Sequence, residues 1–140
     1  MSVGVLLVTH PGVGSSLLHI ATRIIGSSTL PVKCLEVPPG SPLEPVRERA
    51  RSMLKVLNRG TGVLVLTDMF GGTATNLALP FLEPDKVEVV TGVNLPMLVK
   101  LGSLHGRNIP LHELAECLTA AGQKSIQVAS EFLHSRASST

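Results

Sequence analysis

His10 and Asp68 are the two ionisable residues whose placement in the sequence favours chemistry. Each comes directly after a short apolar run of the kind that forms a buried strand. A neutral imidazole nitrogen can attack phosphorus, and the ring titrates near physiological pH. A carboxylate that accepts the N–H of the other ring nitrogen would fix the tautomer and stabilise the cation formed on phosphorylation. The pair therefore predicts a phosphoryl-accepting histidine, whereas a single histidine would more simply cap a turn or fill space.

A glycine-rich turn, Gly71-Gly72-Thr73, follows closely after Asp68. Two glycines allow backbone N–H groups to face an anion, and the helix expected next would present its N-terminus there. The hydroxyl of Thr73 or of Thr75 would add a donor to a phosphoryl oxygen. The same residues would also suit an ordinary strand-to-helix turn with a threonine N-cap. The turn is neither a Walker A loop nor a G-x-G-x-x-G fingerprint, which argues against the usual modes of nucleotide binding.

The remaining polar residues do not favour another chemistry. Cys34 and Cys117 are isolated and fit no metal or redox spacing, and no Gly-x-Ser-x-Gly elbow occurs. The other histidines have no partner at metal-ligand spacing: His19, His105, His112 and His134. We therefore expect neither a metal nor a cofactor.

The composition indicates a single folded domain. Of the 140 residues, 44% are hydrophobic and 16% charged, so enough apolar surface is available for a core. A net charge of +2, with no run of Lys and Arg and few aromatic residues, argues against nucleic-acid binding. We see no signal peptide and no apolar run near the roughly 18 residues that span a membrane, so we expect a soluble cytoplasmic protein. Residues 1–134 are expected to form the domain and residues 135–140 a flexible tail.

The apolar periodicity predicts alternating strands and helices. Short runs rich in β-branched residues predict strands at 3–8, 30–37, 62–67 and 86–91. Helical spacing predicts helices at 15–25, 42–57, 73–82, 95–102 and 111–121. Gly26 and Gly122 are expected to end the first and last of these helices, and Ser41 to cap the second. A short fifth strand at 125–128 and a helical turn at 130–134 complete the expected order.

This order predicts an α/β fold with a mainly parallel open sheet and helices on both faces. The carboxyl ends of parallel strands meet at one edge, where open α/β sheets bind their ligands. Three polar turns are expected at that edge: Thr9-His10, Asp68 to Asn76, and Thr91 to Asn94. If the first and third strands are neighbours, His10 and Asp68 come close in space.

Three segments together resemble the mannose-family IIA component of the phosphoenolpyruvate-dependent sugar phosphotransferase system. They are Val8-Thr9-His10 with Gly12 and Leu17-Leu18; Gly62 to Asp68 with Phe70-Gly71-Gly72-Thr73 and Thr75-Asn76; and Gly92-Val93-Asn94-Leu95-Pro96-Met97-Leu98. The resemblance covers about residues 3–130. The first segment is short, whereas the second and third are long and correctly ordered, so the combination is specific.

The resemblance implies a role for each motif. The family's phosphorylated histidine falls on His10, its orienting aspartate on Asp68, and the hydroxyl of its Gly-Gly-Ser/Thr turn on Thr73. It implies a parallel sheet of order 2-1-3-4, with a fifth, antiparallel strand exchanged across a homodimer, for which residues 125–128 are the candidate. It also implies the phosphocarrier protein HPr as donor and a IIB component, here a separate protein, as acceptor.

Three residues depart from the family pattern. Pro11 follows His10 where the family usually has glycine, which restricts the backbone of both residues. Ala74 replaces a proline common in the family's Gly-Gly-Thr-Pro motif, and Met69 is apolar where a polar side chain can occur. The shape of both turns and one phosphate contact are therefore left open, although no residue of the candidate site is replaced.

Two other functions remain open from the sequence. The same fold would serve as a non-catalytic regulatory module that binds an anion or a protein, in which His10 is never phosphorylated. A phosphocarrier subunit of a dihydroxyacetone kinase shares the IIA-like fold, although the further carboxy-terminal domains of such a subunit are missing here. Phosphoryl transfer to His10 would separate the non-catalytic module from a relay protein in sugar uptake or its regulation.

Overall fold

The computed structural model describes residues 2–26, 32–104 and 106–138. Four parallel strands form one open sheet of order β2-β1-β3-β4: β1 (Gly4–Thr9), β2 (Val32–Glu36), β3 (Val63–Thr67) and β4 (Val87–Thr91). The predicted α/β class, parallel pairing and strand order are confirmed. Residues 30 and 31, where the second strand was expected to begin, lie outside the described residues.

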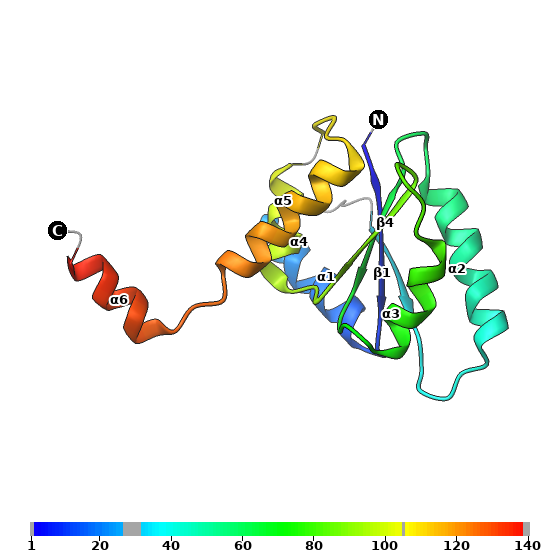
Figure 1. Cartoon of the computed structure of the whole chain (residues 1–140), viewed down its shortest axis with the longest axis horizontal. Coiled ribbons are helices and arrows are strands. Elements are labelled where there is room, and N and C mark those ends of the chain that lie inside the picture. The colour runs from blue at the N-terminus through cyan, green and yellow to red at the C-terminus, as the bar shows by residue number, and fades with distance from the viewer. Residues whose placement is uncertain (1, 27–31, 105, 139–140) are drawn as a thin grey trace.

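Helices cover both faces of the sheet (Figure 1). One face carries α1 (Val13–Ile25), α4 (Leu95–Ser103) and α5 (Leu111–Lys124), and the other carries α2 (Leu43–Leu57), α3 (Thr73–Ala78) and the 3₁₀ turn η1 (Leu79–Phe81). The side chains of β1 alternate between the two cores, with Val5 and Leu7 in the first and Leu6 and Val8 in the second. A central strand covered on both faces is apolar along its whole length, which explains its continuous hydrophobic pattern.

Two helix boundaries differ from those predicted. Ser41 does not cap α2, because Pro42 is the N-cap and the serine hydroxyl donates to a carbonyl in the preceding turn. The helix predicted at 73–82 is instead α3 followed by η1. Pro80 accounts for the change, since it lacks an N–H and its ring would clash with the preceding helical turn. Gly26 ends α1 as predicted, in the left-handed conformation.

Gly122 does not end α5, so that prediction is wrong: the helix continues to Lys124. A Cβ on Gly122 would lie only 2.7 Å from Cγ of Met97, so the glycine allows α4 and α5 to approach closely. Its carbonyl accepts a hydrogen bond from Nδ2 of Asn94 at 3.2 Å. Asn94 also accepts the N–H of Met97 and thereby caps α4. The polar turn after β4 therefore has a structural role.

The carboxy-terminal part differs most from the prediction. In this single chain residues 125–128 form no strand and connect α5 to α6 (Ala129–Ser138). α6 is longer than the turn predicted at 130–134 and includes residues 135–138, which were expected in the tail. Figure 1 shows α6 standing away from the sheet and the other helices. A strand exchanged in a dimer needs a second chain, so that expectation stays a prediction.

Candidate active site

His10 and Asp68 come together at the carboxyl edge of the sheet. β1 and β3 are direct neighbours, with Val8 in register with Thr67, so the residues that follow them are adjacent. Nδ1 of His10 lies 2.8 Å from Oδ2 of Asp68. The backbone N–H of His10 donates to the same oxygen at 2.9 Å. The proximity expected from the sequence is confirmed by both distances.

Asp68 determines which ring nitrogen of His10 carries the proton. Burial raises the pKa of Asp68, but hydrogen bonds from the backbone and ring of His10, with the charge of the ring, outweigh burial and leave the pKa below its ordinary value. An ionised carboxylate only accepts hydrogen bonds, so Nδ1 must be the donor. In the neutral ring Nε2 then holds the lone pair, and no residue in the described ranges hydrogen-bonds to it.

The side chains of His10 and Asp68 differ in solvent exposure. The side chain of His10 is 42% exposed, whereas that of Asp68 is 12% exposed. Oδ1 of Asp68 is shielded from solvent and makes no hydrogen bond within the described part of the chain. The hydrogen bonds of the carboxylate therefore all go to His10, whose imidazole is partly open to solvent.

The turn after β1 is held from inside by Thr9, which is fully buried. Its hydroxyl donates to the carbonyl of His10 and accepts the N–H of Gly14, each at 2.9 Å. A Cβ on Gly14 would also lie 2.9 Å from that hydroxyl oxygen, so a larger residue would push the turn apart. The N–H of Val13 closes the turn on the carbonyl of His10 at 3.2 Å. These bonds fix the backbone on which the imidazole stands.

A buried chain of hydroxyl groups holds the turn after β3. The hydroxyl of Thr75 donates to the carbonyl of Met69, and the hydroxyl of Thr67 lies 2.7 Å from that of Thr75. Because the proton of Thr75 is used on Met69, Thr67 must be the donor to Thr75. Both threonines are fully buried. The start of α3 is thus tied to the end of β3, which the sequence analysis did not predict.

The glycine-rich turn lies beside the imidazole. Gly72 is the N-cap of α3, and a Cβ on it would lie 3.7 Å from Cε1 of His10. Gly71 has a φ of 78°, a conformation that favours glycine. Thr73, the first residue of α3, is exposed. The N–H groups in the first turn of a helix have no helical partner, so donors are available next to the ring.

Glu36 is a residue of this region that the sequence analysis missed. It ends β2, in register with Thr9 of the neighbouring strand. Its Oε2 accepts the N–H of Gly12 at 2.8 Å and the hydroxyl of Ser15 at 2.9 Å. The hydroxyl of Ser15, together with backbone N–H groups, lowers the pKa of Glu36. The signal was present in the sequence, since Glu36, like His10 and Asp68, is an ionisable group at the carboxyl end of a strand.

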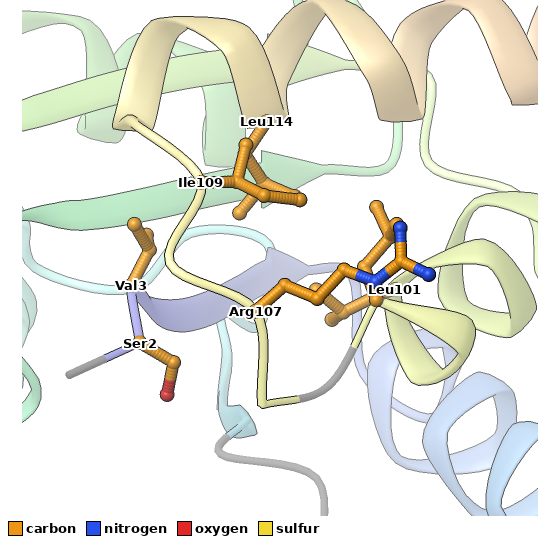
Figure 2. A pocket seen from close by; sticks show the side chains of 7 residues that line it. Ser2, Val3, Leu101, Arg107, Ile109 and Leu114 are labelled. Carbon is orange, nitrogen blue, oxygen red and sulfur yellow. The ribbon is translucent and has the colours of Figure 1, made fainter.

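A small cavity lies at the opposite end of the sheet, near the start of β1 (Figure 2). Its lining residues are Ser2, Val3, Leu101, Leu104, Arg107, Ile109 and Leu114. The volume of about 20 Å³ accommodates about one water molecule, so the cavity is not a substrate site. Among residues 2–26, 32–104 and 106–138 no group of three or more His, Cys, Asp or Glu side chains could hold a metal ion. None of the helices in these ranges is long and apolar enough to cross a bilayer.

The family described as "PTS system fructose IIA component" matches residues 4–119, which include both turns of the site. The chain belongs to this family. This IIA chain is 37% identical over 95 residues to the PTS system fructose-specific EIIA component of Bacillus subtilis (strain 168), covering 67% of this chain and 64% of the relative. It is 27% identical over 128 residues to the PTS system mannose-specific EIIAB component of Escherichia coli (strain K12), covering 91% of this chain and 39% of the relative. The chain therefore spans less than two thirds of the length of either relative.

Solved structures of IIA proteins share the fold. The PTS IIA protein associated with the fucose utilization operon from Streptococcus pneumoniae superposes with a TM-score of 0.79 and 32% identity, over 95% of this chain and 99% of that chain. The mannose/sorbose specific IIA subunit from Enterococcus faecalis gives a TM-score of 0.79 over 91% of this chain and 95% of that chain. At 24% identity the second likeness concerns the fold alone. The resemblance inferred from the three motifs is thus confirmed for family and fold.

Proposed function

We propose that this chain is a IIA component of a sugar phosphotransferase system that accepts a phosphoryl group on Nε2 of His10 and passes it on. The observation that carries the proposal is the 2.8 Å contact between Nδ1 of His10 and Oδ2 of Asp68. In the neutral ring this contact puts the proton on Nδ1 and the lone pair on Nε2. The family and the names of the relatives support a role in sugar uptake or its regulation.

The transfer is a displacement at phosphorus. The lone pair of Nε2 forms the new N–P bond while the N–P bond to the donor histidine breaks, and the donor ring keeps that electron pair. The acceptor ring becomes positively charged with its proton still on Nδ1, and the carboxylate of Asp68 stabilises that charge. Because donor and acceptor are chemically alike, positioning and charge stabilisation matter more than acid–base catalysis.

The turn of Gly71, Gly72 and Thr73 would receive the phosphoryl oxygens. Its first-turn N–H groups and the hydroxyl of Thr73 are donors, and the turn adjoins Cε1 of His10, the carbon between Nδ1 and Nε2. Met69 is 58% exposed and its side chain offers no donor, so the backbone must supply what a polar residue would give there. The flexible backbone of the glycines is suited to that task.

We propose HPr as the phosphoryl donor and a IIB component as the acceptor. The proposed location is the cytoplasm, where both partners would be met. The proposed assembly is a homodimer in which residues 125–128 pair with the sheet of a second copy. These partners follow from the family resemblance, and the exposed imidazole supports them because two different proteins must reach it in turn.

A transfer assay tests the function. The chain is incubated with phosphoenolpyruvate, the general phosphotransferase enzyme and HPr, and its intact mass is measured. We expect the mass of one phosphoryl group to be added, and we expect the label to be lost in acid. The His10→Ala variant should remain unlabelled, whereas His19→Ala, an exposed histidine of α1, should be labelled like the wild type. An unlabelled wild type, under conditions that label a known IIA acceptor, would overturn the proposal and favour the non-catalytic module.

A further inference from the structure

Glu36 lies in the same edge of the sheet as His10 and Asp68 but is not used in the transfer described above. It is the last residue of β2, and β2 pairs with β1 on the side opposite β3. β1 is therefore flanked by two carboxylates, one at the end of each neighbouring strand. Asp68 contacts the imidazole, so the question is what the second carboxylate does.

Glu36 caps the N-terminus of α1 from another strand. A single oxygen, Oε2, accepts three hydrogen bonds: from the N–H of Gly12 at 2.8 Å, the hydroxyl of Ser15 at 2.9 Å and the N–H of Ser15 at 3.4 Å. Gly12 is the N-cap of α1 and supplies no side-chain cap of its own. The carboxylate thus satisfies N–H groups that the helix leaves unpaired, and its charge is favourable next to the positive end of the helix dipole.

Two helices begin close to His10, one in the chain and one in space, and only the first has its N-terminus capped by a carboxylate. α1 begins three residues after His10, and α3 begins beside its ring at Gly72. Unpaired N–H groups at the start of a helix attract anions such as a phosphoryl group. At α1 the N–H groups of Val13 and Gly14 already bond within the turn. Those of Gly12 and Ser15 are occupied by Glu36, whose negative charge also repels a second anion.

We propose that Glu36 is a positioning residue of the site, which fixes the turn carrying His10 and keeps the phosphoryl group off the N-terminus of α1. The transfer part of this inference rests on the proposed function. Glu36 acts through the segment from Gly12 to Ser15 and does not touch the imidazole. With Glu36 in place, the phosphoryl oxygens find hydrogen-bond donors on the side of the ring that faces Gly72.

Substitutions at Glu36 test its role in transfer. Glu36→Gln keeps the shape but removes the charge. We expect kcat for transfer from phospho-HPr to fall about 10- to 100-fold with KM nearly unchanged, by analogy with residues that orient metal ligands. Glu36→Asp keeps the charge and should recover most of the loss. Ser15→Ala removes one of the three bonds and should cost less, with no further loss when it is added to Glu36→Ala. Glu83→Gln, an exposed glutamate just before β4, is the matched control.

Anion binding tests the exclusion without phosphoryl transfer. The wild type and Glu36→Ala are titrated with sulfate while the ¹⁵N–¹H signals of Gly12 and Ser15 are followed. We expect saturable shifts of both signals in Glu36→Ala, weaker shifts in Glu36→Gln and none in the wild type or Glu36→Asp. Signals elsewhere in the chain report whether each variant is folded. If Glu36→Ala does not fold, the comparison is made between the wild type and Glu36→Gln.

The transfer assay and the sulfate titration can each contradict a different part of the proposal. A wild type that is never phosphorylated would end the proposed function, and the sulfate titration alone would then decide the role of Glu36. Wild-type kcat in both Glu36→Gln and Glu36→Ala would overturn the positioning role. Equal sulfate shifts of Gly12 and Ser15 in the wild type and in Glu36→Ala would overturn the exclusion of anions from α1.

Discussion

One oxygen of Asp68 accepts two hydrogen bonds from His10, one from Nδ1 of the ring at 2.8 Å and one from the backbone N–H at 2.9 Å. The two residues are 58 positions apart in the chain and meet because β1 and β3 are neighbours. The backbone bond fixes the position of the main chain of His10, and the ring bond fixes the orientation of its imidazole. Both the tautomer and the direction of Nε2 therefore depend on a single carboxylate.

Asp68→Asn should keep the fold and slow transfer from phospho-HPr at least about tenfold. An amide can present its NH₂ group to Nδ1, which would favour the tautomer with the proton on Nε2 and remove the nucleophilic lone pair. Rapid-quench transfer kinetics measure the effect, with circular dichroism as the check on folding. Asp85→Asn is the matched control, because Asp85 is exposed, lies before β4 at the other end of the sheet, and has a positive φ that asparagine tolerates. Equal rates in the wild type and Asp68→Asn would remove Asp68 from the mechanism.

Asp68 should also make the stability of the chain sensitive to acid. Its folded-state pKa is lowered, so its contribution to stability is present above the unfolded value, ordinarily 3.8, and is lost as the pH falls through the folded value. Urea unfolding from about pH 4.5 downward should show a steeper loss of stability in the wild type than in Asp68→Asn. Parallel curves for the two proteins over this range would show that the carboxylate is not stabilised by His10.

Thr75→Val should destabilise the chain by about 1–3 kcal/mol, because it leaves the buried hydroxyl of Thr67 without its acceptor and the carbonyl of Met69 without its donor. Thr119→Val is the control, since the half-buried hydroxyl of Thr119 only donates to the carbonyl one turn earlier in α5. We expect the control to remain within about 0.5 kcal/mol of the wild type in urea unfolding. A loss of similar size in both variants would mean that the hydroxyl chain has no special role in holding the turn.

Much of this site could be predicted from the sequence, because the rule that ligands bind at the carboxyl ends of parallel strands needs only the positions of buried strands. That rule identified His10 and Asp68. It applied equally to Glu36. That residue was overlooked because the predicted strand runs to Val37, which placed Glu36 inside the strand and not at its end. The hydroxyl chain from Thr67 through Thr75 could not be foreseen, since it depends on how two buried side chains orient toward each other.

The end of α5 shows why local pattern alone was insufficient. A glycine near the end of a helical pattern usually marks its C-terminus, which led to the wrong boundary at Gly122. In the structure Gly122 lies against Met97 of α4, where a larger residue would not fit. The spacing of residues within one segment does not show such contacts between elements. The sequence pattern predicted a short strand at 125–128 and the resemblance added its exchange across a dimer, but a single chain cannot supply the partner that such a strand would need.

Gly122→Ala should destabilise the chain by about 1–3 kcal/mol, since the new Cβ would lie 2.7 Å from Cγ and 2.9 Å from Sδ of Met97. Helix propensity alone predicts the opposite, a gain of roughly 1 kcal/mol. Ala120→Gly, at an exposed position of the same helix, measures that propensity in place and should cost about that amount. Thermal or urea unfolding of both variants gives the comparison, and a stabilised Gly122→Ala would mean that α4 and α5 do not pack closely here.

The position of the phosphoryl group on His10 tests the central claim most directly. The chain is labelled with ¹⁵N, phosphorylated through HPr, and examined by long-range ¹H–¹⁵N correlation of the imidazole and by ³¹P–¹⁵N coupling. We predict that phosphorus is bonded to Nε2 of His10 and that Nδ1 keeps its proton, which it donates to Asp68 in a hydrogen bond. Phosphorylation at Nδ1 of His10, or at any other histidine, would contradict the account.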